Sequence, residues 1–252
     1  MQLGVASVGA SVLNVLARLK ISDFPDAPQA PAYVGRSKLE VLLGRSIWNE
    51  VGGRTVLDFG CGPGHEVVEM AEHGAAHVVG IDIQDKWLRQ AKQAADAAGV
   101  ADRCTFAKTW NEPVDVIVCV DCFEHFADPA GILRHMRSLL KSSGRVLVSF
   151  GPPWGHPLGG HLYSIFPFSH LVFPDSALVR WRSTIKTDGA RTILESGLNK
   201  MTVRRFERVV AESPFRFEKF EVVPIRKLRR IANRLTREFT TSIVRCRLAP
   251  RD

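Results

Sequence analysis

Apolar residues along the chain follow two alternating spacings, which predict strands and helices in alternation. Short apolar runs indicate strands over 55–59, 77–82, 103–108, 114–120 and 145–150. Apolar residues three and four apart indicate helices over 37–50, 65–73, 85–98 and 129–140. Alternating strands and helices form a mostly parallel sheet with helices on both faces. The first 150 residues therefore predict an α/β domain of the doubly wound type.

The regular alternation stops after Phe150. Residues 151–190 are rich in proline, glycine, histidine and aromatic residues, and no periodic pattern runs through them. A compact domain rarely carries a long structureless segment unless that segment is functional. We therefore predict that residues 151–190 form an insertion over an acceptor site. The remaining elements are a helix over 202–212 and two strands, 215–223 and 240–248, around a further helix.

The turn after the first predicted strand is suited to binding a ligand. The strand ends in Asp58, and the loop behind it carries Gly60, Gly62 and Gly64. Glycine has no Cβ and tolerates positive φ, so a ligand can approach bare backbone there. A second acid, Asp82, ends the second strand 24 residues later, where a carboxylate can bind ribose hydroxyls.

Two nucleotide-type ligands fit such a loop, and their charges distinguish them. A dinucleotide pyrophosphate is anionic and goes with the spacing G-x-G-x-x-G, whereas the third glycine comes early here, at Gly64. S-adenosylmethionine (SAM) carries a cationic sulfonium and an ammonium group, so the acid Asp58 at the strand end favours SAM. Asp82 supports a nucleoside of either class.

Four segments, taken in order and with their spacing, resemble the class I SAM-dependent methyltransferases. They are VLDFGCGPG at 56–64, VVGIDI at 78–83, DVIVCVDCFEHFADP at 115–129 and LLKSSGRVLVSF at 139–150. The GCG and EH…DP motifs are similar to those of the small-molecule branch, which includes quinone-biosynthesis methyltransferases. The resemblance covers roughly residues 36–150. It implies a seven-stranded sheet that ends in an antiparallel strand pair.

The resemblance also implies which residues hold SAM. Asp58 and the glycine loop would bind the methionine half, Asp82 the ribose, and Ile83 would pack beside the adenine. Asp121 would lie between cofactor and acceptor, and Arg36 would pair with the methionine carboxylate. The expected cofactor residues are Asp58, Gly60, Cys61, Gly62, Gly64, Asp82, Ile83, Thr109, Trp110, Asp121 and Arg36.

The end of the third strand departs from the family pattern. Many relatives place Gly-Asp-Ala there, and the Asp accepts a hydrogen bond from the adenine amino group. This chain instead has Lys108-Thr109-Trp110-Asn111. Adenine would then stack on Trp110 and bond to Asn111 or to the backbone. The alternative is that Trp110 is a plain core or surface aromatic residue.

Histidines are the candidates for chemistry at the acceptor. Methyl transfer from a sulfonium is an in-line displacement in which alignment supplies most of the rate. A base is needed only for a hydroxyl or a protonated amine, and the candidates are His125, His156 and His161. Trp154 and Tyr163, with His156 and His161, are the candidate acceptor-binding residues. A structural role for each histidine is the alternative, and no metal site is expected.

The net charge is concentrated near the C-terminus. The chain has 34 Lys and Arg against 26 Asp and Glu, a net charge of +8, and residues 226–251 alone account for that excess. Because the rest of the chain is neutral, no nucleic-acid partner is expected. One helix is predicted over 226–239, and its apolar stripe either packs on the sheet or lies on an anionic membrane. The stripe consists of Leu228, Ile231, Leu235 and Phe239.

The terminal segments and the cysteines predict the domain bounds and the cellular location. Residues 1–35 predict a helical lid segment, and residues 36–252 a methyltransferase domain. No apolar run approaches the roughly 20 residues of a membrane span, and the first residues lack the basic start of a signal peptide. Five cysteines fit a reducing compartment, and Cys119-x-x-Cys122 is expected to pack in a strand. The expected location is the cytoplasm, with peripheral membrane contact through the basic helix.

The sequence as a whole predicts a SAM-dependent methyltransferase that acts on a small-molecule acceptor, at oxygen. An RNA methyltransferase that uses the basic helix is the first alternative. The neutral body of the chain counts against it, and no Asn-Pro-Pro-Tyr-like motif follows the fourth strand. A non-catalytic SAM-binding regulatory protein is the second alternative, against which the intact motifs count.

Overall fold

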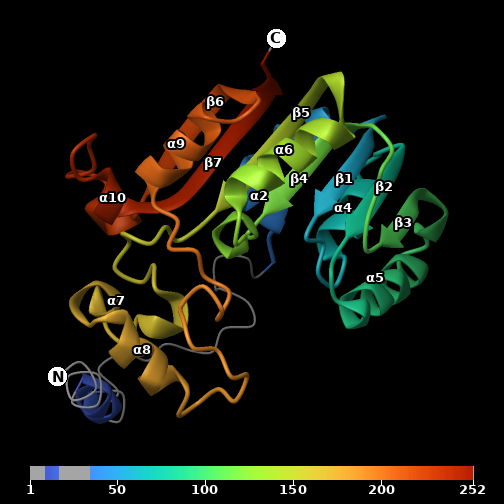
Figure 1. The fold of residues 1–252 in the computed structure, drawn as a ribbon. Coiled ribbons are helices and arrows are strands. Elements are labelled where there is room, and N and C mark those ends of the chain that lie inside the picture. Colours follow the sequence, from blue (N-terminus) through green and yellow to red (C-terminus); the bar gives the residue numbers. More distant parts are fainter. Residues whose placement is uncertain (1–8, 17–34, 252) are drawn as a thin grey trace.

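The computed structural model describes residues 9–16 and 35–251 of the 252-residue chain, and its centre is a single seven-stranded sheet (Figure 1). The strand order is β3-β2-β1-β4-β5-β7-β6. The strands are β1 (Thr55–Phe59), β2 (His77–Ile81), β3 (Cys104–Ala107), β4 (Val114–Val120), β5 (Leu140–Phe150), β6 (Phe215–Pro224) and β7 (Thr241–Pro250). Strands β1 to β5 are parallel, and β7 is antiparallel to both β5 and β6. The predicted fold class is confirmed, including the terminal antiparallel pair and the insertion after the fifth strand.

Helices cover both faces of the sheet. Those around the sheet are α2 (Lys38–Leu43), α3 (Ile47–Val51), α4 (His65–Glu72), α5 (Asp85–Ala97), α6 (Pro129–Leu139) and α9 (Val203–Ala211). Apolar residues of α6 and α9 pack on one face, and those of α2 to α5 pack on the other. The helix α6 begins where the sequence predicts, because the Asp128 carboxylate accepts from the Gly131 N–H at 2.9 Å and Pro129 stands in the first turn.

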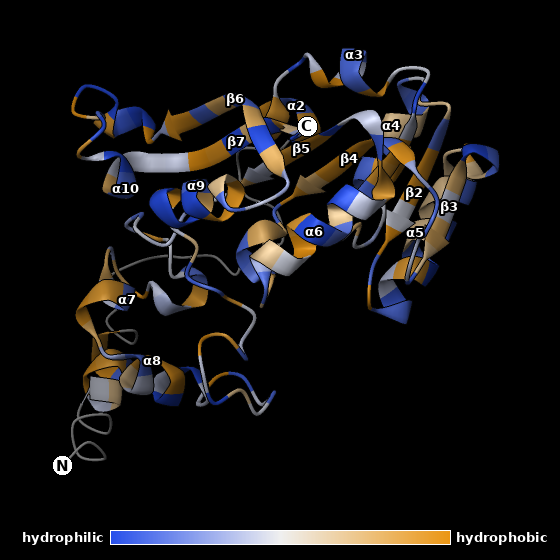
Figure 2. Ribbon diagram, turned by 45° about the horizontal axis from the view of Figure 1, so that its top comes forward, coloured by the Kyte–Doolittle hydropathy of each residue, from blue (hydrophilic) through white to orange (hydrophobic). Residues whose placement is uncertain are grey.

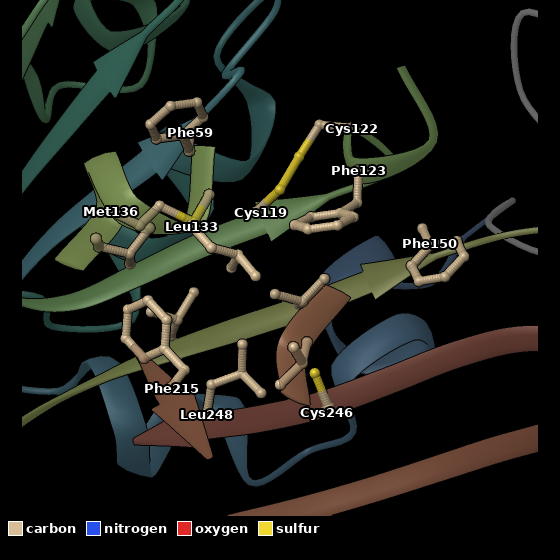
Figure 3. Packing of buried hydrophobic residues seen from close by; sticks show 14 of the residues in the cluster. Phe59, Cys119, Cys122, Phe123, Leu133, Met136, Phe150, Phe215, Cys246 and Leu248 are labelled. Carbon is tan, nitrogen blue, oxygen red and sulfur yellow. A yellow bond between two sulfur atoms is a disulfide. The ribbon is translucent and has the colours of Figure 1, made fainter. Parts of the chain in front are cut away.

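Each strand contributes to two cores because its side chains alternate between the faces. In β4, Val116 and Val118 point into the core under α2 to α5, whereas Ile117 and Cys119 point into the core under α6 and α9. Figure 3 shows the second of these cores, in which Leu133 lies beside Met136 and the Phe123 and Phe150 rings are 6.2 Å apart. Burial on both sides explains why β4 is a continuous apolar run, as is typical of a central parallel strand.

The predicted helix over 37–50 is wrong as a single element. It is broken into α2 and α3 at Gly44, whose φ of +88° lies in the left-handed region that an α-helix cannot use. The Ser37 hydroxyl accepts from the Glu40 N–H at 3.0 Å and so begins α2. Lys38 stands in the first turn of α2.

The predicted helix over 226–239 is also wrong. The structure has a 3-10 turn, η5 (Arg226–Leu228), then a loop, and only a short helix, α10 (Arg237–Thr240). Side chains compete with the backbone in this loop: Asn233 Oδ1 accepts from the Leu235 N–H at 2.8 Å, and the Thr236 hydroxyl donates to the Ile231 carbonyl at 2.7 Å. Such local bonds favour turns over a helix, so the apolar stripe does not form.

The segment after β5 is ordered and has a core of its own. It contains the 3-10 turn η4 (His161–Tyr163) and the helices α7 (Ser169–Val172) and α8 (Asp175–Arg182). Residues 9–16 are helical and pack against α8, with Ala10 and Leu13 buried in this third core (Figures 1 and 2). Most of the predicted lid segment, 1–35, lies outside the described residues.

Candidate cofactor and acceptor site

The carboxyl ends of β1, β2 and β4 enclose a pocket with a volume of about 500 Å³. Ligands of open parallel sheets bind at this edge, so the position agrees with the topology. The residues that line the pocket are Phe59, Gly60, Ile81, Asp82, Ile83, Gln84, Lys108, Thr109, Asp121, Cys122, His125, Phe126, Ile132 and His135. Five of the eleven predicted cofactor residues are therefore lining residues: Gly60, Asp82, Ile83, Thr109 and Asp121.

Asp82 connects the glycine loop to the second strand. Its Oδ2 atom accepts from the Gly62 N–H at 3.1 Å, and its Oδ1 atom accepts from the Gln84 N–H at 2.8 Å. Each carboxylate oxygen has a second lone pair, so both can still accept from a ligand hydroxyl. The two backbone donors therefore hold the carboxylate in a fixed orientation at the pocket. The predicted role of Asp82 as a ribose ligand is compatible with this geometry.

The glycines of the loop serve different purposes. Gly60 has a φ of +89° and exposes its backbone to the pocket, and Gly62 has a φ of +50°. Gly64 is needed for packing instead, because a Cβ there would lie 2.6 Å from the Ala91 Cβ of α5. The Cys61 side chain is buried behind the loop, and burial raises the pKa of its thiol. Cys61 and Gly64 thus shape the loop without lining the pocket.

A lysine that the sequence analysis missed lies behind the pocket among three acids. Lys38 Nζ is 3.1 Å from a carboxylate oxygen of Glu66 and 3.1 Å from one of Asp121. Burial lowers the pKa of Lys38, but the charges of Glu66 and Asp121 outweigh it and raise that pKa above its usual range. Arg36, the predicted cation, is exposed two residues earlier. The predicted pairing of Arg36 with the methionine carboxylate stays a prediction, and Lys38 is the cation that the structure places beside Asp121.

Asp58 is the buried acid of the same group. Only 3% of its surface is exposed, and its Oδ2 atom has no hydrogen-bond partner among the described residues. Burial, with the nearby Glu66 charge, raises the pKa of Asp58 well above its usual value. A buried carboxyl oxygen without a partner is costly, so it marks a place where a ligand donor fits.

The residues after β3 divide between pocket and core. Thr109 lines the pocket, whereas Trp110 is half-buried and packs against the core under α6 and α9. Its indole Nε1 has no hydrogen-bond partner within the described ranges. The arrangement matches the plain core alternative for Trp110. Ile83, with 85% of its surface exposed, offers the apolar surface at this end of the pocket.

The turn that follows β4 is held by a residue far along the chain. The 3-10 turn η3 (Phe123–His125) has its carbonyl groups bound by Asn199, whose Nδ2 donates to Phe123 O at 2.9 Å and to Phe126 O at 2.8 Å. The Asn199 N–H also donates to Glu124 O at 2.9 Å. This clamp fixes the direction of the neighbouring side chains at the pocket edge. No local pattern in the sequence signals a contact between residues so far apart.

Glu124 lies in this turn but does not line the pocket. It is 4% exposed, and burial, with the neighbouring Asp121 charge, raises its pKa to about 8. Its carboxyl is therefore protonated in the folded chain between the unfolded-state pKa near 4.5 and about 8. Between these two pH values the folded state holds a proton that the unfolded state has lost. The contribution of Glu124 to stability is therefore greatest below pH 4.5 and is lost as the pH rises through about 8.

We expect Glu124→Gln to remove that pH dependence. The amide has the shape of the protonated carboxyl and never ionises, so the variant should lose less stability than the wild type between neutral pH and pH 9. Urea unfolding at several pH values measures the difference. Parallel loss of stability in both proteins across this range would contradict the assignment.

Two of the predicted catalytic histidines meet at the pocket edge. The His125 and His161 rings are 5.9 Å apart, edge to face, and His125 lines the pocket. His125 Nδ1 lies 2.5 Å from the Gly197 carbonyl oxygen, which can only accept, so Nδ1 carries the proton and Nε2 is the free lone pair. Burial, with the neighbouring His125 charge, lowers the pKa of His161 to about 4.

The other predicted acceptor residues are turned away from the pocket, and two of them, Tyr163 and Trp154, belong to the third core. His156 is 9% exposed, and its Nδ1 atom accepts from the Leu158 N–H at 2.9 Å. Tyr163 is 1% exposed and its hydroxyl donates to Ser196 at 2.8 Å. Trp154 packs against the same core and meets the His170 ring edge to face at 4.8 Å. None of these three residues lines the pocket, and their contacts are those of a structural core.

Cys119 and Cys122 are joined by a disulfide, so the expectation that this pair only packs in a strand is wrong. The chain turns directly after β4, where Asp121 has a φ of +50°, and this turn brings the two sulfur atoms together. Within the described ranges, no group of three or more His, Cys, Asp or Glu side chains is placed to hold a metal ion. No helix of those ranges is long and apolar enough to span a bilayer.

The geometry of the fold and the pocket defines a class: nucleoside-binding α/β domains with a glycine loop after the first strand and an acid after the second. A family described as a methyltransferase domain matches residues 29–181, more than half of the chain. The chain belongs to this methyltransferase-domain family.

Several known methyltransferases are similar to this chain in sequence or in fold. A ubiquinone biosynthesis O-methyltransferase of Neisseria meningitidis is 38% identical over 104 residues, which cover 38% of this chain and 44% of that protein. The matched part thus spans less than half the length of that relative. A SAM-dependent methyltransferase from Mesorhizobium loti shares the fold with a TM-score of 0.54 and 20% identity, over 81% of this chain and 94% of that one. A magnesium protoporphyrin IX methyltransferase from Synechocystis, with bound SAH, reaches 0.55 and 15% identity over 99% of both chains.

Proposed function

We propose that this protein is an enzyme that transfers a methyl group from SAM to an oxygen atom of a small-molecule acceptor. The observation that carries the proposal is the pocket where the strands β1, β2 and β4 end, with a bare glycine backbone on one side and fixed carboxylates on the other. The family membership of the chain supports methyl transfer. The Neisseria relative is an O-methyltransferase by name, which supports an oxygen acceptor.

The residues present fit SAM on three counts. Asp58 has a buried oxygen without a hydrogen-bond partner among the described residues, and the carboxylates of Glu66 and Asp121 share the single cation Lys38. That excess of carboxylates suits a cationic ligand. The pocket volume of about 500 Å³ lies in the ordinary range of small-molecule sites. When bound, SAM supplies an electrophilic methyl group on a positively charged sulfur.

The chain's own residues would bind and orient the reactants. Asp82 would accept from ribose hydroxyls, Ile83 and Thr109 would flank the adenine, and Asp121 would face the methionine end. His125 is the residue best placed to take a proton from an acceptor hydroxyl, because its Nδ1–H is held by the Gly197 carbonyl and its Nε2 is free. The imidazole can act as a base near neutral pH.

The SAM site is tested by Asp82→Ala. Loss of hydrogen bonds to a charged group should weaken SAM binding by about 1.5–3 kcal/mol, measured by calorimetry on the folded variant. Asp96→Ala is the matched control, because Asp96 is an exposed acid of the neighbouring helix α5 and does not line the pocket. Equal SAM affinity in the Asp82 variant and the wild type would reject the site.

Release of S-adenosylhomocysteine in the presence of hydroxylated, amine and quinone-like acceptors tests the reaction itself. Turnover with a hydroxylated compound alone agrees with transfer to oxygen. Tight SAM binding without turnover on any acceptor would favour the alternative of a non-catalytic SAM-binding regulator. A cytoplasmic location is a further part of the proposal.

A further inference from the structure

The loop between β6 and α10 carries most of the uncompensated positive charge. We call residues 226–236 the basic loop. Its five cations are all exposed, and within the described ranges none of them forms an ion pair with an acid; they are Arg226, Lys227, Arg229, Arg230 and Arg234. The loop itself contains no Asp or Glu.

The acids beside the basic loop are already engaged elsewhere. Glu238 accepts from the backbone N–H groups of Val203 and Arg204, at 3.1 and 2.8 Å, where it caps α9. Glu207 forms an ion pair with Arg237. Neither carboxylate is therefore free to neutralise the loop, and its charge faces solvent.

Large apolar side chains are exposed among these cations. Leu235 is 81% exposed, Ile231 57% and Phe239, in α10, 50%. Phe239 meets Phe168 edge to face at 6.4 Å, which connects this surface to α7. Figures 1 and 2 both place α7 next to α10, and Figure 2 colours α7 as hydrophobic and most of the basic loop as hydrophilic. In α7, Val172 is 68% exposed.

We propose that the basic loop, with α10 and α7, docks the protein on the surface of a bilayer that contains anionic phospholipids. Cations attract the anionic headgroups, while exposed aliphatic tips enter the interface between headgroups and acyl chains. Both kinds of side chain are present on one surface here. The sequence left open whether the apolar stripe packs on the sheet or lies on a membrane, and the broken helix removes the first option.

The chemistry of the surface distinguishes a membrane from nucleic acid. A phosphate backbone would use the arginines but gives no role to an exposed Leu235 or Ile231, whereas single-stranded nucleic acid is usually held by stacked aromatic rings. The basic loop also leaves the candidate active site open, because none of its residues lines that pocket. Docking and cofactor binding are therefore separable.

Flotation of the full chain with vesicles tests the proposal. We expect binding to vesicles of phosphatidylcholine mixed with phosphatidylglycerol, little binding to phosphatidylcholine alone, and release as salt rises, because exposed charges are screened beyond about 8 Å at physiological ionic strength. Absence of binding to the mixed vesicles at low salt would overturn the proposal. Equal binding to both kinds of vesicle would overturn the role of the cations.

Three sets of substitutions separate charge, apolar contact and fold. Replacing Arg229, Arg230 and Arg234 by Gln should weaken binding to the mixed vesicles on the order of 100-fold. Leu235→Ser with Ile231→Ser should weaken it by at least about tenfold. The matched control replaces Lys86, Arg89 and Lys92 of α5 by Gln, because these exposed cations pack at the opposite edge of the sheet, beside β3.

Unchanged vesicle binding in both loop variants would overturn the proposal, as would an equal loss in the α5 control. A single-stranded RNA oligonucleotide that binds the wild type more tightly than the vesicles, and loses binding only with the three arginines, would assign the surface to RNA instead. SAM calorimetry on every variant shows that the fold and the cofactor site are intact. A failure of docking is thereby distinguished from a failure of the proposed methyl transfer.

Discussion

His125→Ala is expected to lower kcat by about 10²–10⁴-fold on a hydroxyl acceptor, the range for loss of a general base, with SAM affinity close to that of the wild type. The reason is the fixed tautomer: the Gly197 carbonyl holds the Nδ1 proton at 2.5 Å, so Nε2 is the acceptor at the pocket edge. A rise in pH should partly restore the variant, because an ionised acceptor needs no base. Steady-state kinetics across pH, with the natural or a screened acceptor, measures both effects.

His135→Ala is the matched control for this experiment. His135 is also exposed and lines the same pocket, but it comes from α6, and its ring meets Phe59 edge to face at 6.1 Å. It should lose far less activity than the His125 variant. Wild-type turnover in His125→Ala, or the same loss in both variants without recovery at high pH, would contradict a base at His125.

The second large effect concerns stability. Phe206→Ala should lower the free energy of unfolding by about 3–5 kcal/mol, the usual cost of removing a large buried ring. The Phe206 side chain is fully buried in α9, and its ring centre is 5.0 Å from those of Phe123 and Phe150. It therefore connects α9 to the turn η3 beside the pocket and to the end of β5.

Urea unfolding at neutral pH measures this cost. Phe239→Ala is the comparison, since half of that side chain is exposed, and surface changes of this kind usually stay near 0.5 kcal/mol. A cost below about 1 kcal/mol for Phe206→Ala would mean that the core collapses around the gap or that the aromatic cluster is not as tightly packed as the ring distances imply.

Most of the sheet follows from local pattern, and so does part of the site. The runs at 55–59 and 114–120 correspond to β1 and β4, because strands buried on both faces must be apolar throughout. Gly60, Asp82 and Asp121 line the pocket because a parallel sheet places the ends of its strands at one edge. These predictions need no knowledge of distant contacts.

Predictions for the insertion were weaker because composition does not show whether a side chain points into a pocket or into a core. Aromatic and histidine content suggested an acceptor site, yet Tyr163 packs in a separate core with Leu13 of the N-terminal helix, and His156 is buried. A segment that is dense in such side chains can build either a pocket or a small core. Which of the two forms depends on neighbours that lie elsewhere in the chain.

The helix over 226–239 illustrates the same limit at a smaller scale. Periodic apolar residues at Ile231 and Leu235 predict a helix, but such a pattern is stabilised mainly by burial. Among the described residues Ile231 and Leu235 stay exposed, and side-chain bonds from Asn233 and Thr236 favour a loop. The spacing of apolar residues does not show whether another surface of the protein is available to cover them.

The sequence by itself determined the α/β alternation, the glycine loop and the acids at the ends of the first two strands. These features depend only on the spacing of apolar residues and on the identity of residues within one short segment. Tertiary structure alone decided that Lys38 bridges Glu66 and Asp121, that Asn199 clamps the turn after β4, and that Gly197 sets the tautomer of His125. Each of these contacts joins segments that are distant in the chain. Packing brings these segments together, and the local spacing of residues does not predict such contacts.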